Sequence, residues 1–324
     1  MRLLRQESGS PSQNECSPFS TNTPAQGARE GFITADDGIR LYYRIEGEGA
    51  QTVIVPAALY LERDLAGLAK GRRMVFYDMR GRGRSDRVED TTHITIHWDV
   101  RDLERVRRHV GAERFVPVGF SYLGLMVMMY AAEYPERVER VIQIGPVPRK
   151  YGTEYPRELT ANDPSPVPDS TARAELSRIR ESDLPRTDPR AHCTREYELT
   201  RTGLVGDPSL AERVPNVCHM QNEWPANFRR HLGYHFVGSV QKLDVPWETF
   251  ARVTMPVLTI HGTRDRNAPY GAGREWASRL PDARLLTVRG AAHMPWLDNP
   301  SLVLGAMETF LQREWPSEAD RVQR

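Results

Sequence analysis

The chain has 324 residues, which is long enough for one large domain with an insertion or for two modest domains. Hydrophobic residues make up 39% of it, which is compatible with a buried core, and the formal net charge is +1. This near-neutral charge gives no reason to expect a nucleic acid or an acidic membrane as a partner. No run of about 18 apolar residues occurs, so a membrane-spanning helix is excluded.

The cysteines and the N-terminal residues indicate the cellular compartment in which the protein is expected. Cys16, Cys193 and Cys218 are an odd number without metal-ligand spacing, so we expect no disulfide framework and a reducing cytoplasm as the simplest setting. The N-terminus turns polar at once and lacks the apolar stretch of a secretory signal. Residues 1–28 are rich in Ser, Pro, Asn, Gln and Thr, which predicts a disordered polar tail.

The first periodic segments predict strands. Residues 31–34 and 39–44 alternate between apolar and polar side chains, and the Asp-Asp-Gly of residues 36–38 is typical of a hairpin turn between them. Residues 52–55 and 73–78 are near-continuous apolar runs, as expected of buried parallel strands.

Helices and strands then alternate. A short helix is predicted over residues 61–69, and the spacing of apolar residues predicts an amphipathic helix over 98–110. Strand 115–120, helix 122–134 and strand 138–144 continue the pattern. Such an alternation favours the α/β class, with a mostly parallel sheet flanked by helices on both faces.

The alternation stops after Pro146 and resumes at Val253. Residues 147–248 hold many prolines, dense charge and helical fragments but no convincing buried strand, which is how an insertion between two strands looks. We therefore expect a core made of residues 29–146 and 249–315, with residues 147–248 inserted as a helical cap.

Beyond the insertion the strand pattern returns. Residues 256–260 and 284–288 predict two further buried strands, and residues 301–310 have the spacing of an amphipathic closing helix.

Three residues with the chemistry of a serine hydrolase follow predicted strands. Ser121 lies in the Gly-Phe-Ser-Tyr-Leu-Gly run of residues 119–124, between a strand and a helix, which is the setting of a nucleophile elbow. Asp265 and His293 each follow a later strand, in the chain order of an α/β-hydrolase triad. Each residue alone is weak evidence, because serine and aspartate are common in turns and the chain has nine histidines. Their joint occurrence at three strand ends favours a catalytic triad.

The three residues would have distinct roles. Ser121 would be the nucleophile, and His293 the base that accepts its proton and later protonates the leaving group. Asp265 would fix the histidine tautomer and stabilise the imidazolium.

The tetrahedral intermediate also needs two backbone N–H donors aimed at its oxygen. The residue after the nucleophile, Tyr122, is the first candidate. The loop after strand 52–55 should supply the second. Pro56 has no N–H, so Ala58 is the better candidate there, with Leu59 as the alternative.

Two other motifs have simpler interpretations. The glycine-rich residues 78–86 follow a strand, but they lack the Lys-Ser/Thr ending of a P-loop and the helix of a dinucleotide fingerprint, so we expect a structural loop. His93 and His97 are four residues apart without the glutamate of a zinc-protease motif. No cofactor and no metal are expected.

The sequence resembles the α/β-hydrolase superfamily over residues 30 to 315, on the branch of proline iminopeptidases and cap-bearing esterases. The motifs that carry the resemblance are the loop 78–86, the serine turn 119–124, the acid loop 262–269 and the His-Met-Pro-Trp that begins at His293. The resemblance implies a cofactor-free serine hydrolase whose cap shapes substrate choice.

The sequence departs from this family at two places. Pro56 and Ala57 stand where the family has a histidine and a glycine, beside the expected oxyanion donor. Leu123 occupies the usual glycine position two residues after the serine, with Gly124 displaced by one.

Several functions share this chemistry. The first hypothesis is a hydrolase of small or medium carboxylic esters; a lactonase or a carbon–carbon bond hydrolase would use the same triad. An aminopeptidase that removes an N-terminal proline would need cap carboxylates for the substrate amine, with Glu196, Glu198 and Glu223 as candidates. A non-catalytic ligand-binding protein on the same fold is the alternative from another class.

Substrate contacts are harder to predict. Leu59 and three aromatic residues of the insertion, Trp224, Phe228 and Tyr234, are candidates for the pocket mouth. The expected partner is a small-molecule ester or a short peptide, bound by a monomer or a homodimer.

Overall fold

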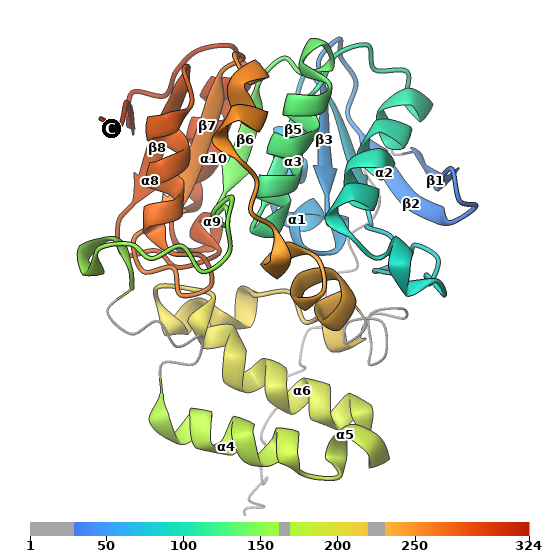
Figure 1. The fold of residues 1–324 in the computed structure, drawn as a ribbon, viewed down its shortest axis with the longest axis vertical. Coiled ribbons are helices and arrows are strands. Elements are labelled where there is room, and N and C mark those ends of the chain that lie inside the picture. The colour runs from blue at the N-terminus through green and yellow to red at the C-terminus, as the bar shows by residue number, and fades with distance from the viewer. Residues whose placement is uncertain (1–28, 162–168, 220–230, 324) are drawn as a thin grey trace, which may run out of the picture.

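The computed structural model describes residues 29–161, 169–219 and 231–323. The predicted polar tail, residues 1–28, lies outside them. A nine-stranded sheet with the order β1-β2-β4-β3-β5-β6-β7-β8-β9 forms the centre (Figure 1). Pairs β1–β2, β2–β4 and β8–β9 are antiparallel and the others are parallel. The strands are β1 (Arg29–Thr34), β2 (Arg40–Glu46), β3 (Thr52–Pro56), β4 (Arg73–Tyr77), β5 (Val116–Phe120), β6 (Val141–Ile144), β7 (Val257–Gly262), β8 (Ala283–Val288) and β9 (Ala319–Asp320).

Helices cover both faces of the sheet, as the alternation predicted. Side chains of α2, α3 and α8 share one hydrophobic core with alternate strand residues such as Ile54, while α1 and α10 share a second core with Val53 and Val55. Neighbouring residues of β3 therefore point into opposite cores, as the pleat of a strand requires. The helices are α1 (Ala58–Leu65), α2 (Ile96–His109), α3 (Tyr122–Glu133), α4 (Ser170–Glu181), α5 (Leu184–Thr187), α6 (Pro189–Thr200), α8 (Tyr270–Arg279), α9 (Pro295–Asp298) and α10 (Pro300–Leu311).

Local sequence explains where α2 begins and ends. The Thr95 hydroxyl accepts a hydrogen bond from the Trp98 N–H and caps the first turn. Gly111, with a φ of 64°, follows the last turn in the left-handed region that glycine adopts without strain. Between these ends, Val100, Leu103 and Val106 form the buried face.

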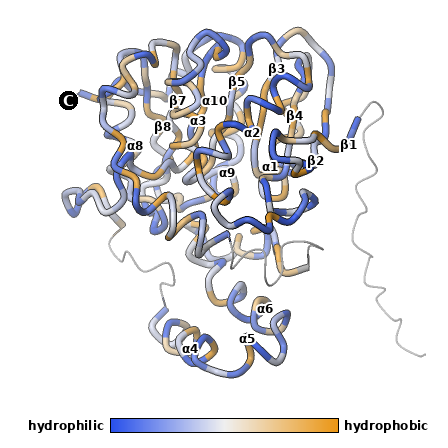
Figure 2. Tube along the Cα trace, turned by 45° about the vertical axis from the view of Figure 1, so that its right-hand side comes forward, coloured by the Kyte–Doolittle hydropathy of each residue, from blue (hydrophilic) through white to orange (hydrophobic). Residues whose placement is uncertain are grey.

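The insertion between β6 and β7 contains α4, α5 and α6. In Figure 1 these helices form a separate group beyond the end of the sheet where α1 and α9 lie. Figure 2 shows hydrophilic and hydrophobic stretches alternating along them, as in amphipathic helices. The two ends of the insertion meet where Asp244 binds Arg149 at 2.8 Å and Lys150 at 2.7 Å. None of the described helices is long and apolar enough to cross a membrane.

One strand and two helices, α8 and α9, escaped the sequence patterns. The two residues of β9, Ala319 and Asp320, pair antiparallel with β8, beyond the expected end of the core at residue 315. A strand of two residues has no periodicity to detect.

A disulfide joins Cys193 on α6 to Cys218, and their Cα atoms are 5.8 Å apart. The expectation of unpaired cysteines is therefore wrong for these two residues. The odd number of cysteines and their wide spacing gave no sign of this pair. A bond across 25 residues depends on how the insertion folds rather than on a local motif. The cysteines consequently give no support to a reducing compartment.

Loss of this bond should destabilise the insertion. Cys193→Ser opens a loop of 25 residues. The entropy released to the unfolded chain predicts a loss of about 3 kcal/mol of unfolding free energy for the segment that the bond closes. Proteolysis rates of the insertion under native conditions measure this opening, with Cys16→Ser as the control. Equal proteolysis of the two variants would contradict a stabilising disulfide.

Candidate active site

Ser121 sits at the sharp turn from β5 into α3. Its backbone has φ 59° and ψ −127°, a combination that costs energy in a residue with a Cβ atom. Its N–H donates to the Ile144 carbonyl at 2.9 Å, which fixes the turn against the end of β6. Gly119 allows the turn to be this tight, because a Cβ there would lie 2.3 Å from the Leu123 carbonyl oxygen. The serine is partly exposed beyond the sheet edge, as the strand-to-helix pattern predicted.

The displaced glycine after the serine has its own packing role. A Cβ on Gly124 would lie 2.8 Å from the Cβ of Pro146, so glycine lets α3 approach the loop after β6. Leu123 is 2% exposed and belongs to the core on the α3 side of the sheet. The turn therefore accommodates the departure from the family pattern by placing the leucine in the core.

Asp265 and His293, from the loops after β7 and β8, form a buried pair. The carboxylate Oδ2 lies 2.8 Å from the His293 Nδ1, and the two residues are 1% and 5% exposed. The other oxygen, Oδ1, accepts the N–H groups of Asn267 at 2.8 Å and Ala268 at 2.9 Å. The aspartate is thus held by its own loop and presents one oxygen to the histidine.

The charge state of Asp265 follows from these contacts. Burial alone would raise the pKa of this carboxyl, but the imidazoles of His293 and His261 outweigh it and hold the pKa well below its usual value. The His261 Nε2 lies 3.2 Å from the same oxygen that contacts His293. An ionised Asp265 favours the His293 tautomer with a proton on Nδ1, which leaves Nε2 as the basic atom.

Residues next to Ser121 lie close to His293 around the end of β6. The ring of Phe120, the residue before Ser121, is centred 4.7 Å from the His293 ring. A Cβ on Gly145, the residue after β6, would lie 3.2 Å from Asp265 Oδ2 and 3.3 Å from His293 Nδ1. Within the described ranges the Ser121 hydroxyl makes no hydrogen bond. Such contacts are often long without substrate.

The loops after the neighbouring strands β3 and β5 carry the candidate oxyanion donors. Tyr122 and Ala58 are the first residues of α3 and α1, where N–H groups have no partner within the helix. The Leu59 N–H instead donates to Asp78 Oδ1 at 3.1 Å, which removes Leu59 as a donor and leaves Ala58. Ala57, at the position where the family has glycine, adopts a left-handed conformation with φ 59° and ψ 50°. This conformation is strained in a residue that carries a Cβ atom.

Comparisons with known proteins identify the family of this chain. The alpha/beta hydrolase fold profile matches residues 56–300, most of the chain. The chain belongs to this family.

Relatives within the family differ in activity. The bifunctional esterase/perhydrolase DCH of Acinetobacter calcoaceticus is 25% identical over 81% of this chain and 92% of its own length. The proline iminopeptidase of Heyndrickxia coagulans is 22% identical over 87% and 98%. Among solved structures, the serine hydrolase CCSP0084 of Cycloclasticus zankles has a TM-score of 0.68 at 16% identity, covering 88% of this chain and 98% of its own. Esterase and peptidase relatives support a hydrolase, and the structural likeness supports the fold.

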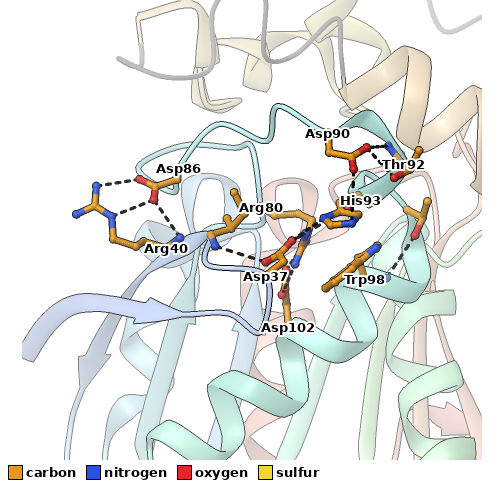
Figure 3. A network of polar contacts seen from close by, with 11 residues as sticks. Asp37, Arg40, Arg80, Asp86, Asp90, Thr92, His93, Trp98 and Asp102 are labelled. Atoms are coloured by element: carbon orange, nitrogen blue, oxygen red, sulfur yellow. Dashed lines mark hydrogen bonds and ion pairs between the residues drawn. The ribbon is translucent and has the colours of Figure 1, made fainter.

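The glycine-rich loop after β4 holds the loop after β3 in place. Asp78 is fully buried and, besides the Leu59 N–H, accepts the N–H and the Nε of Arg84 at 2.9 and 2.8 Å. Figure 3 shows the next anchor, where Arg80 binds Asp102 through two contacts of 2.7 Å and Asp37 through one of 2.8 Å. These pairs are internal, as expected of a structural loop.

His93 and His97, the two histidines near this loop, differ in their surroundings. His93 places its Nδ1 2.9 Å from Asp37 Oδ2, at the edge of the Arg80 network in Figure 3. His97 is exposed on the first turn of α2.

The structure gives the exposure of two of the four predicted substrate contacts. Tyr234 lies in the insertion with 48% of its surface exposed, and Leu59 is partly exposed on α1. Both remain predictions. Trp224 and Phe228 lie outside the described residues, as does Glu223.

Sequence reasoning missed one cluster beside the serine. The Tyr122 hydroxyl lies 3.3 Å from the His231 Nε2, and the ring of His235 is centred 4.7 Å from that of Tyr122. Asp99 of α2 binds His235 in turn. The one available signal was the four-residue spacing of the histidines, which has no meaning without knowledge of the facing helix.

Removing the Asp78 carboxylate should destabilise the fold. Asp78→Ala leaves the partly buried Leu59 N–H without its acceptor and releases Arg84 from a fully buried partner, for an expected cost of about 2–3 kcal/mol of unfolding free energy. Asp86 provides the matched control in the same loop, because it pairs with the exposed Arg40. Asp86→Ala should cost no more than about 1 kcal/mol. Urea denaturation compares the two, and equal losses would contradict the anchoring role of Asp78.

Proposed function

We propose that this chain is a serine hydrolase that cleaves small or medium carboxylic esters through an acyl-enzyme intermediate. The observation that carries the proposal is the buried Asp265–His293 pair at 2.8 Å, set at the same sheet edge as the strained turn of Ser121. A strained backbone beside a buried acid–base pair is the combination that nucleophilic catalysis by serine requires.

The reaction would begin at the serine. The Ser121 Oγ attacks the ester carbonyl carbon while its proton passes to His293 Nε2. The imidazolium that forms is stabilised by the ionised Asp265, whose lowered pKa keeps it charged. The negative carbonyl oxygen of the tetrahedral intermediate is held by the N–H groups of Tyr122 and Ala58.

Collapse of the intermediate would release the alcohol. The bond from the carbonyl carbon to the alcohol oxygen breaks, and His293 gives its proton to that oxygen. A water molecule then attacks the acyl-enzyme, with His293 accepting its proton, and the Ser121 oxygen leaves and regains a proton. The net reaction converts ester and water to acid and alcohol.

The insertion would act as the cap over this site. Figure 1 places α4–α6 beyond the sheet end from which α1 and α9 project, the end at which the strands carry Ser121, Asp265 and His293. A cap on that side would exclude water from the acyl-enzyme and select the substrate.

The aminopeptidase alternative receives less support from the insertion. Its predicted amine-binding carboxylates should be available to a substrate, yet Glu196 hydrogen-bonds to Arg180 and Glu198 to Arg195 at 3.0 Å. Both carboxylates are therefore occupied on α6. Lactonase and carbon–carbon bond hydrolase activities would use the same three groups, and a non-catalytic ligand-binding protein would have no need of a strained serine.

Substrate assays with Ser121→Ala test this proposal. Hydrolysis of a p-nitrophenyl ester series should fall by at least about a thousandfold, because the nucleophile is lost while the oxyanion donors remain. Ser182→Ala, which removes an exposed hydroxyl at the end of α4, is the control and should keep its rate.

Proline p-nitroanilide distinguishes the alternatives in the same assay. A higher kcat/KM for this amide than for the esters would move the assignment to an aminopeptidase. Ester turnover that survives in Ser121→Ala would contradict the serine mechanism.

A further inference from the structure

The side chain that follows the nucleophile is held by two histidines of the insertion. Tyr122 places its hydroxyl 3.3 Å from the His231 Nε2, and its ring lies 4.7 Å, centre to centre, from that of His235. The two imidazoles are stacked, with ring centres 4.4 Å apart and planes 16° apart. Both come from the π-helical segment His231–Val237. Such wide turns are frequent at functional sites.

The core supplies an anchor for the second histidine. Asp99, on the first turn of α2, is fully buried and hydrogen-bonds through Oδ2 to the His235 Nε2, which is also fully buried. The cluster of Asp99, His231, His235 and Tyr122 therefore joins the insertion, α2 and the serine turn. We call it the two-histidine cluster.

Three buried polar atoms of this cluster lack a hydrogen bond. Among the described residues, His231 Nδ1, His235 Nδ1 and Asp99 Oδ1 have no partner, although His231 is only 7% exposed and the other two are fully buried. An unpaired buried polar atom is costly, and native proteins pair nearly all of them with protein, water or ligand. Three such atoms in one cluster, next to the nucleophile, point to a polar ligand.

The charge of the cluster limits what that ligand can be. Burial lowers the pKa of His231 well below its usual value, and the neighbouring His235 and Arg82 lower it further. His231 is therefore a neutral imidazole, whose Nδ1 either donates or accepts one hydrogen bond. An anionic group would gain most from a charged imidazole, a state that burial and Arg82 oppose. A hydroxyl or keto oxygen suits the neutral ring.

A second contact ties this region to the other oxyanion loop. Arg82 is 5% exposed and donates through Nη2 to the Tyr60 hydroxyl at 3.1 Å. Tyr60 lies in the first turn of α1, two residues after Ala58, and Tyr122 is the first residue of α3, directly after Ser121. Polar side chains are thus linked to both loops that carry the candidate oxyanion donors.

We propose that the two-histidine cluster is a substrate subsite for an uncharged oxygen function, a hydroxyl or a keto group, close to the scissile carbonyl. The subsite rests on the proposed ester hydrolase function and specifies its substrate class: short esters with an oxygen substituent in the acyl or alcohol part. His231 is the specificity-determining residue, and Asp99 and His235 are positioning residues behind it.

Matched substrate pairs test the subsite. One pair is p-nitrophenyl 3-hydroxybutyrate and p-nitrophenyl butyrate; the other is 2-hydroxyethyl butyrate and ethyl butyrate. The readout is the ratio of kcat/KM for the hydroxylated ester to that for the plain one. Damage to folding affects both members of a pair equally and cancels in this ratio.

His231→Phe keeps the ring and removes its hydrogen bonds. The ratio should fall about tenfold on at least one pair, the loss expected for one buried hydrogen bond to substrate. His231→Asn, which keeps a donor and an acceptor, should retain most of the native ratio. His192→Phe replaces a buried histidine on α6 outside the cluster and should leave the ratio unchanged.

The outcomes separate the two proposals. The subsite alone would be overturned if the ratio of kcat/KM values were the same in the native chain and in His231→Phe for both substrate pairs. No turnover of any ester by the native chain would overturn the proposed function, and the subsite with it.

Discussion

The reversed backbone of Ser121 is the constraint on which the candidate site depends. Its φ of 59° turns the chain from β5 into α3 within one residue and leaves the serine partly exposed at the end of the strand. Close packing holds the strained residue in place. The backbone at position 119 has no room for a Cβ atom, and the Ser121 N–H donates to the Ile144 carbonyl oxygen. The same turn sets the Tyr122 side chain against the two histidines.

The energetic cost of the site is concentrated at a few places. In the described part of the chain, three residues other than glycine have positive φ, and two of them, Ala57 and Ser121, directly precede the helices that carry the oxyanion candidates. Buried charge is the other cost. Asp265 offsets its own burial with two N–H bonds and two imidazoles, so its carboxylate stays ionised and oriented before substrate arrives. Strain and buried charge together at one sheet edge are expected of a functional site.

Sequence patterns predicted what is local and periodic. The buried strands, the amphipathic α2 and the serine turn were visible because their signals lie within a few residues, and the chain order of Ser121, Asp265 and His293 follows from strand order. Contacts made by tertiary packing were not visible. The Leu59 N–H is taken by a side chain from the loop after β4, and Cys193 pairs with a residue whose position depends on the fold of the insertion. The two-histidine cluster needs three separate elements to meet.

The central claim is that Ser121 is activated by His293 as a nucleophile. The most direct measurement is labelling of the native chain with a fluorophosphonate probe, followed by peptide mass spectrometry to locate the adduct. We expect one adduct, on Ser121, whose formation is slowed by an ester substrate and abolished in His293→Ala. An unlabelled Ser121, or labelling that persists without His293, would contradict the account.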